Sequence, residues 1–182
     1  MCGGSTLGVG RGEDALVDPD PILAAIASQA AVEGRRAPGF WLPDGRGRLV
    51  GSSDFAGRPM ILAFWGPAAP ASARALKILN DLATESIPQD LACVAVCLDR
   101  DAETVGAFKH DVGEHVISLW DRGRHFGDGL EWSDSPLATA YDVSEVPTVF
   151  LLDRERRVVE QFAGEIDCDR LRRSVGELLA ER

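Results

Sequence analysis

The chain has 182 residues, 45% of them apolar, so it can bury one substantial core and leaves little room for a second full domain. Its formal net charge of -10 argues against nucleic-acid binding, because phosphate recognition needs a basic patch and the arginines are scattered among acidic residues. No stretch approaches about eighteen consecutive apolar residues, so the sequence predicts no membrane-spanning helix.

The N-terminal part of the chain precedes the predicted domain and divides into two pieces. Residues 1–19 are rich in glycine and acidic residues and carry too few apolar side chains to fold alone, so they are expected to be flexible. Residues 20–36 are expected to form a short helix and linker, because Asp20 can cap a helix that has proline in its first turn and Gly34 can end it.

Cys2 stands in the sequence Cys-Gly-Gly-Ser, which is how many mature bacterial lipoproteins begin, with the lipid on the cysteine. This favours an extracytoplasmic protein, periplasmic or lipid-anchored through Cys2. A cytoplasmic protein with its natural start is the alternative, because no charged and apolar signal precedes the cysteine.

The most informative segment is residues 59–74, PMILAFWGPAAPASAR. Its first seven residues predict a strand buried on both faces. Pro70 suits the first position of a helix, and Leu76, Leu79 and Ala83 follow at helical spacing. Redox enzymes use such a strand, tight loop and helix start to hold a nucleophilic thiol, because unpaired N–H groups and the helix dipole lower the pKa of the thiol.

This segment resembles the active-site loop of the TlpA/ResA-type thiol:disulfide oxidoreductases of the thioredoxin superfamily, which has the pattern F-W-x-x-W-C-P-x-C. Phe64, Trp65 and Pro70 match that pattern. The resemblance places Ala69 at the position of the attacking cysteine and Ser72 at that of the resolving cysteine. Neither side chain can perform thiol chemistry, so no catalytic residue is intact.

The resemblance covers about residues 37–179 and includes three more segments. Residues 37–45, APGFWLPDG, resemble the opening segment of the family, and residues 91–99, LACVAVCLD, resemble its second parallel strand. Residues 146–153, VPTVFLLD, resemble the cis-proline strand. Together these segments are a specific match to the family pattern, although each segment alone would be a weak match.

In the family, the backbone beside the cis-proline faces the active-site loop and pairs with an extended substrate peptide. The resemblance therefore implies that Val146 and Pro147 bind a protein or peptide ligand. Trp65, Pro70 and Thr148 complete this expected binding face.

The remaining elements follow from local patterns. Asp101 can cap a helix, residues 115–119 predict a short strand, and residues 150–162 predict an antiparallel hairpin. Asp167 can cap a last helix with a repeating apolar face. Together they predict an α/β thioredoxin-like fold over residues 37–182, with a mixed central sheet flanked by helices and the inserted βα unit of TlpA- and peroxiredoxin-type members.

A long glycine-rich segment, residues 121–136, interrupts this order, and loops of this length are usually functional or poorly ordered. One interpretation is a lid whose aromatic side chains plug the edge of the domain. The other is a binding groove beside Pro147, lined by Trp120, Phe126 and Trp132.

The other cysteines offer no replacement for the missing pair. Cys93 and Cys97 lie four apart on one strand, about 13 Å between Cα atoms, which is beyond disulfide reach and predicts unpaired core residues. Cys168 lies in the first turn of the last helix without an evident partner. The three histidines show no ligand spacing, so neither a metal nor another cofactor is expected.

Two functional classes stay open. One is a natural, redox-inactive thioredoxin-fold module that binds a protein or peptide at the cis-proline face. The other is a thiol:disulfide oxidoreductase whose active-site cysteines were replaced by mutation. Ala68, in place of the second tryptophan, and Ala63, where thioredoxins proper carry a buried acid, agree with a loss of catalysis.

Overall fold

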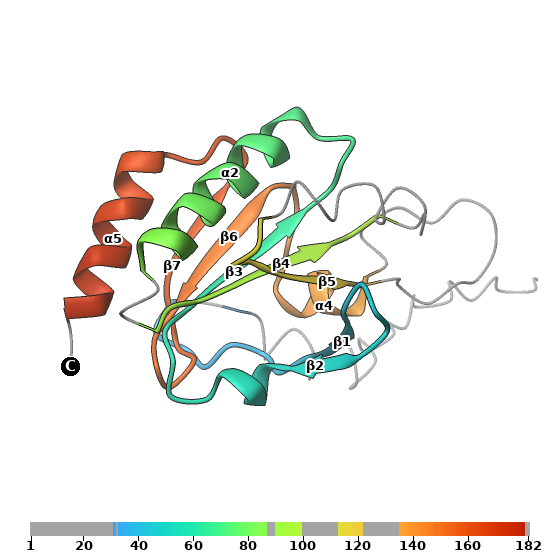
Figure 1. The fold of residues 1–182 in the computed structure, drawn as a ribbon, viewed down its shortest axis with the longest axis horizontal. Helices are drawn as coiled ribbons and strands as arrows, with labels where there is room; N and C mark the ends of the chain where they lie inside the picture. Colours follow the sequence, from blue (N-terminus) through green and yellow to red (C-terminus); the bar gives the residue numbers. More distant parts are fainter. Residues whose placement is uncertain (1–30, 32, 87–89, 100–112, 122–134, 181–182) are drawn as a thin grey trace, which may run out of the picture.

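The computed structural model describes residues 31, 33–86, 90–99, 113–121 and 135–180. A five-stranded sheet with the strand order β5-β4-β3-β6-β7 forms the centre of the domain (Figure 1). Its strands are β3 (Met60–Trp65), β4 (Ala92–Cys97), β5 (Ile117–Trp120), β6 (Thr148–Leu152) and β7 (Val158–Ala163). The first three are parallel, and β6 and β7 are antiparallel to their neighbours. This mixed sheet has the architecture that the sequence predicts.

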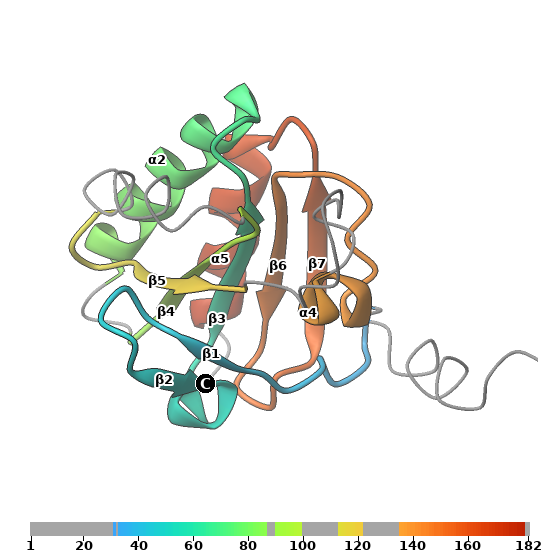
Figure 2. The same ribbon diagram turned by 90° about the vertical axis from the view of Figure 1, so that its right-hand side faces the viewer.

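Different elements cover the two faces of the sheet (Figure 1, Figure 2). One face carries α2 (Pro70–Glu85) and α5 (Cys168–Ala180). The other is covered by β1 (Trp41–Pro43), β2 (Leu49–Gly51), the 3-10 helix η1 (Ser52–Phe55) and α4 (Pro136–Ala140). Because side chains alternate along a strand, Trp65 lies in the core under α2 and its neighbour Phe64 lies in the core on the opposite face.

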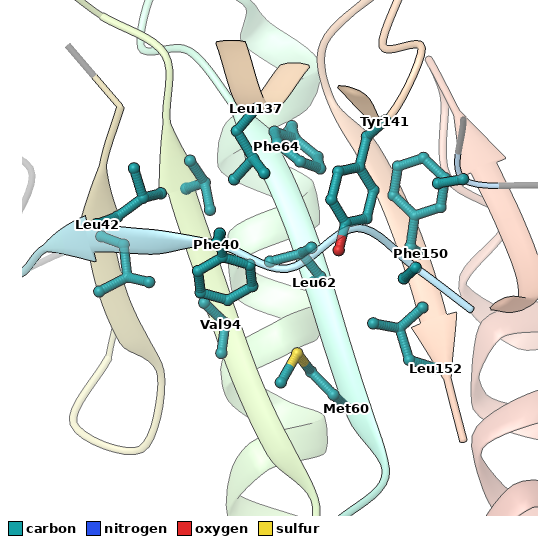
Figure 3. Packing of buried hydrophobic residues seen from close by; sticks show 14 of the residues in the cluster. Phe40, Leu42, Met60, Leu62, Phe64, Val94, Leu137, Tyr141, Phe150 and Leu152 are labelled. Carbon is teal, nitrogen blue, oxygen red and sulfur yellow. The ribbon is translucent and has the colours of Figure 1, made fainter. Parts of the chain in front are cut away.

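Three aromatic rings fill the centre of the core on the β1–β2 side (Figure 3). The ring centroid of Tyr141 lies 5.3 Å from that of Phe64 and 5.1 Å from that of Phe150, in tilted and edge-to-face arrangements. The hydroxyl of Tyr141 donates a hydrogen bond to the carbonyl of Pro38 at 2.8 Å. This cluster therefore anchors the segment that enters the domain to the middle of the sheet.

Residues 33–37 add backbone pairing to the start of β7. The N–H of Gly34 donates to the carbonyl of Val158 at 2.8 Å, and the N–H of Val158 donates to the carbonyl of Arg35 at 2.9 Å. The end of the segment expected to be a linker is thus hydrogen-bonded into the domain.

The prediction for the C-terminal elements is confirmed. β6 and β7 form an antiparallel hairpin, and Oδ1 of Asp167 accepts hydrogen bonds from the backbone N–H groups of Asp169 (3.1 Å) and Arg170 (3.0 Å) at the start of α5. The helix α4, which begins where the expected loop 121–136 ends, is not among the predicted elements. Of the segment 20–36, where a helix and linker are predicted, only residues 31 and 33–36 are described, and the helix predicted after Asp101 lies outside the described residues.

Candidate functional site

A tight turn joins the carboxyl end of β3 to α2. The N–H of Ala69 donates to the carbonyl of Gly66 at 3.1 Å, and the N–H of Ser72 donates to the carbonyl of Ala69 at 2.9 Å. Pro70 occupies the first position of the helix, where its missing N–H costs nothing. The strand, turn and helix start predicted for residues 59–74 are therefore present.

The two positions that match catalytic cysteines differ in accessibility. Ser72 is only 1% exposed, and its Oγ accepts a hydrogen bond from the N–H of Gly66 at 3.3 Å. Ala69 is half-buried and forms part of the wall of a pocket. The buried hydroxyl thus stabilises the turn, and only the methyl group of Ala69 borders the space where a ligand can bind.

The pocket lies beyond the carboxyl ends of β3 and β4 and has a volume of about 400 Å³. It is lined by Gly66, Pro67, Ala68, Ala69, Leu98, Asp99 and Val146. Ligands of α/β proteins bind at this end of parallel strands, and the volume is within the range of ligand sites. The lining residues are small or apolar except for Asp99.

Val146 closes the pocket from the side of β6. The Val146–Pro147 peptide bond is cis, and Cγ2 of Val146 lies 3.7 Å from the point that a Cβ on Gly66 would occupy. The carbonyl of Pro147 accepts a hydrogen bond from the N–H of Gly164 at 2.9 Å. The loop before β6 is therefore in contact distance of the turn before α2.

The residues expected to bind a peptide fall into two groups. Val146 lines the pocket, and Pro70 is exposed at the start of α2. Trp65, Pro147 and Thr148 are buried and are not among the residues that line the pocket.

Trp120, one of the three aromatic residues expected to line a groove beside Pro147, is buried and is not among the residues that line the pocket. It is 9% exposed and lies in the hydrophobic core under α2. Its Nε1 donates a hydrogen bond to the carbonyl of Asp99 at 2.5 Å, because a buried indole N–H needs an acceptor. Phe126 and Trp132 lie outside the described residues. Trp120 therefore acts on the pocket indirectly, by holding the backbone of Asp99.

A family model described as Redoxin matches residues 32–176. The chain belongs to the Redoxin family. The thiol-disulfide oxidoreductase ResA of Bacillus thuringiensis strain Al Hakam is 30% identical over 132 residues, which are 72% of this chain and 70% of the relative. The resemblance to ResA-type proteins inferred from the loop residues is therefore confirmed.

Solved structures agree on the fold. A Chlorobium tepidum protein assigned as the thiol:disulfide interchange protein DsbE has a TM-score of 0.71 at 24% identity, over 83% of this chain and 100% of that one. The exposed lipoprotein thioredoxin of Streptococcus pneumoniae strain TIGR4 has a TM-score of 0.63 at 20% identity, over 78% of this chain and 100% of that one. The α/β thioredoxin-like fold of this Redoxin-family chain is thereby confirmed.

The cysteines of β4 are unpaired and buried, as predicted. Burial raises the pKa of the Cys93 thiol to about 12. The pKa of Cys97 is raised to about 11, mainly by burial, while the backbone N–H of Asp99 lowers it and the carboxylate of Asp99 raises it. Cys168 is exposed on α5, and its thiol donates to the carbonyl of Ile166 at 3.7 Å.

Asp121 and Ser135 form a buried hydrogen-bonded pair that was not predicted from the sequence. Oδ2 of Asp121 accepts hydrogen bonds from the hydroxyl of Ser135 and, at 3.2 Å, from the N–H of Leu137. Oγ of Ser135 accepts the N–H of Ala138 at 2.9 Å. The Ser-Pro pair at residues 135–136 is a helix-start signal that could have revealed α4.

Among the described residues, no helix combines the length and apolar character needed to cross a membrane. In the part of the chain that the structure describes, histidine, cysteine and acidic side chains form no group of three or more that could hold a metal ion.

Proposed function

We propose that this Redoxin-family protein is a redox-inactive module that binds an extended protein segment or peptide at the pocket beside Val146. One observation carries the proposal. The turn and the start of α2 keep the arrangement of a ligand site, while Ala69 and Ser72 occupy the two positions where thiols would react.

The side chains present explain the expected lack of redox chemistry. Disulfide exchange requires attack by a thiolate. Ala69 has no nucleophile, and the buried hydroxyl of Ser72 has a far higher pKa than a thiol. Cys93 and Cys97 cannot replace them, because burial keeps both thiols protonated near neutral pH.

Backbone groups beside the pocket support the binding of an extended segment. The ladder between β3 and β6 ends at the pair Phe64 and Thr148. In the part of the chain that the structure describes, no hydrogen bond to the backbone of Val146 is present. An extended peptide can use these groups by strand addition, with one of its side chains in the pocket.

The second candidate is a thiol:disulfide oxidoreductase whose two cysteines have been replaced. The intact turn between β3 and α2 and the similarity to ResA favour it. Both candidates agree that the chain as it stands does not exchange disulfides.

The test combines binding and activity on the full chain. In NMR titrations with an extended, cysteine-free peptide, we expect shift changes at Gly66, Ala69 and Val146. Ala69→Trp should place an indole in the pocket and abolish these changes, whereas Ala180→Trp, at the exposed end of α5, should not. Reduction of a model disulfide by the unmodified chain, or binding that Ala69→Trp leaves intact, would contradict the proposal.

An extracytoplasmic location is part of the proposal. Its support is the fold similarity to the exposed lipoprotein thioredoxin of Streptococcus pneumoniae and the Cys-Gly-Gly-Ser sequence at Cys2. Fractionation of cells that make the protein, with a lipid-labelling assay on the parent and on Cys2→Ser, tests location and lipid attachment separately.

A further inference from the structure

The hairpin of β1 and β2 carries two large apolar side chains on its outer face, which is separate from the pocket. Its inner face packs on the core through Leu42 and Val50, and side chains alternate along a strand, so Trp41 and Leu49 point outward. Trp41 is 63% exposed and Leu49 is 62% exposed, more than any other large apolar side chain of the described residues. The hairpin lies on the side of the sheet opposite to α2 and α5 (Figure 1).

The indole of Trp41 is held against the hairpin by the lack of a side chain at Gly51. The two residues are partners in the pairing of β1 with β2. A Cβ on Gly51 would lie 2.8 Å from both Cε2 and Cζ2 of the ring, so only glycine leaves room for the indole in this position. The ring is therefore already ordered at the surface, which lowers the entropy cost of using it to bind.

The turn of the same hairpin exposes cationic side chains. Oδ1 of Asp44 accepts hydrogen bonds from the N–H groups of Arg46 at 2.8 Å and Arg48 at 2.9 Å, and its Oδ2 pairs with Nε of Arg48 at 3.4 Å. The guanidinium of Arg46 is exposed and forms no ion pair with any of the described residues. One carboxylate and two guanidinium groups give the hairpin a net charge of +1, in a chain whose net charge is -10.

We propose that the outer face of the hairpin binds the surface of a bilayer that contains anionic lipids. Trp41 and Leu49 insert among the headgroups, while Arg46 and Arg48 contact lipid phosphates. Tryptophan and arginine suit this boundary because each combines an apolar body with a polar end. The inference goes beyond the peptide site, since it concerns another face of the molecule and a different ligand.

The small size of the patch favours a bilayer over a second folded protein. A large aromatic side chain offers about 150–250 Å² of surface, so Trp41 and Leu49 together expose a few hundred Å² at most. A stable protein complex needs about 800 Å² from each partner. A weak membrane contact is useful at this size, because a single lipid chain anchors a protein only marginally and a second contact adds to it. The lipid proposed at Cys2 would be such a chain, and the hairpin contact does not require it.

Vesicle binding by the full chain, with no lipid on Cys2, tests the proposal. The probes are vesicles of phosphatidylcholine alone and vesicles in which about one third of the lipid is phosphatidylglycerol. In co-sedimentation at low salt, we expect at least about fivefold tighter binding to the anionic vesicles, because about 1 kcal/mol is gained for each arginine near an anionic surface. Added salt should weaken this binding.

Two pairs of variants separate the apolar and the charged parts of the contact. Trp41→Ser should lower binding to the anionic vesicles about tenfold, whereas Val159→Ser, which removes a 42% exposed apolar side chain from β7, should not. Arg46→Gln should lower it about fivefold, whereas Arg173→Gln, at an exposed position of α5, should not. Circular dichroism verifies that each variant is folded.

Equal binding of the parent and Trp41→Ser, equal binding to the two kinds of vesicle, or no binding to either would overturn the proposal. Self-association of the parent without lipid, lost in Trp41→Ser and measured by analytical ultracentrifugation, would overturn it in favour of a second copy on the hairpin. Peptide binding at the pocket should be the same in Trp41→Ser as in the parent. A failure of the membrane contact therefore leaves the proposed function standing.

Discussion

Thiol chemistry needs both an accessible site and a cysteine in it, and in this molecule the loop before α2 provides the site whereas the strand β4 carries the cysteines. The loop has a pocket and a helix start, but Ala69 and Ser72 bring no thiol to it. β4 has the thiols of Cys93 and Cys97, but both are buried under α2 with pKa values raised to about 12 and about 11. The reactivity of a cysteine therefore depends on solvent access and on groups that stabilise its thiolate, so the number of cysteines in a chain does not predict redox activity.

Moving thiols into the loop should have the largest effect. In the double variant Ala69→Cys, Ser72→Cys, we expect disulfide exchange to rise from none to a measurable rate, because the turn and the first residues of α2 remain in place. The measurement is reduction of a model disulfide in the presence of a regenerating thiol. Such a gain would favour the origin of this chain from an oxidoreductase that lost only its cysteines.

The control for that experiment is Ala69→Cys alone, which can form a mixed disulfide but has no resolving thiol in the loop. We expect it to accumulate the mixed disulfide without turnover. A double variant that folds, by circular dichroism, and stays inert would show that the rest of the site has also diverged.

The thiols of β4 should react far more slowly with an alkylating reagent than the exposed Cys168 of the same molecule. At pH 8 we expect Cys93 and Cys97 to be modified at least about a hundredfold more slowly, because few molecules expose a thiolate there. Mass spectrometry of digested samples assigns each site, and unfolding in urea should equalise the rates. Modification of Cys97 as fast as that of Cys168 would make it a reactive residue of the site.

The strands and helices beside the site could be predicted from the sequence, because their signals are local. The apolar run of β3, Pro70 at the helix start and Asp167 as a cap each depend on neighbours a few residues away. The family pattern also located Ala69 and Ser72.

The pocket could not be predicted in the same way, because it is built by pairing between distant segments. The parallel register that sets Trp65 opposite Cys97 brings Asp99 to the loop, and the pairing of β3 with β6 brings Val146 there. Trp120 illustrates the limit. An aromatic residue at the end of a strand is visible in the sequence, but the face on which it lies depends on the register of β5 against β4.

Alkaline pH should lower the free energy of unfolding, because it favours ionisation of the two buried thiols of β4. A thiol with a pKa raised in the folded state stabilises the protein fully below its unfolded pKa, near 9.0, and this contribution is lost as pH rises toward the folded values of about 11 and about 12. We expect the free energy of unfolding to fall by a few kcal/mol between pH 9 and 11. Urea titrations at several pH values between 9 and 11 measure this change in the free energy of unfolding.

The variant Cys93→Ala, Cys97→Ala isolates the contribution of the two thiols. It should be less stable near neutral pH because it loses buried atoms, yet its stability should change less between pH 9 and 11 than that of the parent. Burial also raises the pKa of Tyr141, which contributes in the same direction in both proteins. Parallel pH curves for parent and variant would show that the thiols do not control alkaline stability.

The smallest expected effect is that of the buried hydroxyl in the loop. Ser72→Ala removes the acceptor for the N–H of Gly66 and leaves that donor without its partner, so we expect a loss of about 1 kcal/mol in the free energy of unfolding. Ser53→Ala, at an exposed position of η1, is the matched control and should change stability little. Equal stabilities of the two variants would mean that Ser72 does not hold the turn. A larger loss for Ser72→Ala, with NMR shifts confined to residues 66–72, would show that serine at this position stabilises a loop whose thiol chemistry is gone.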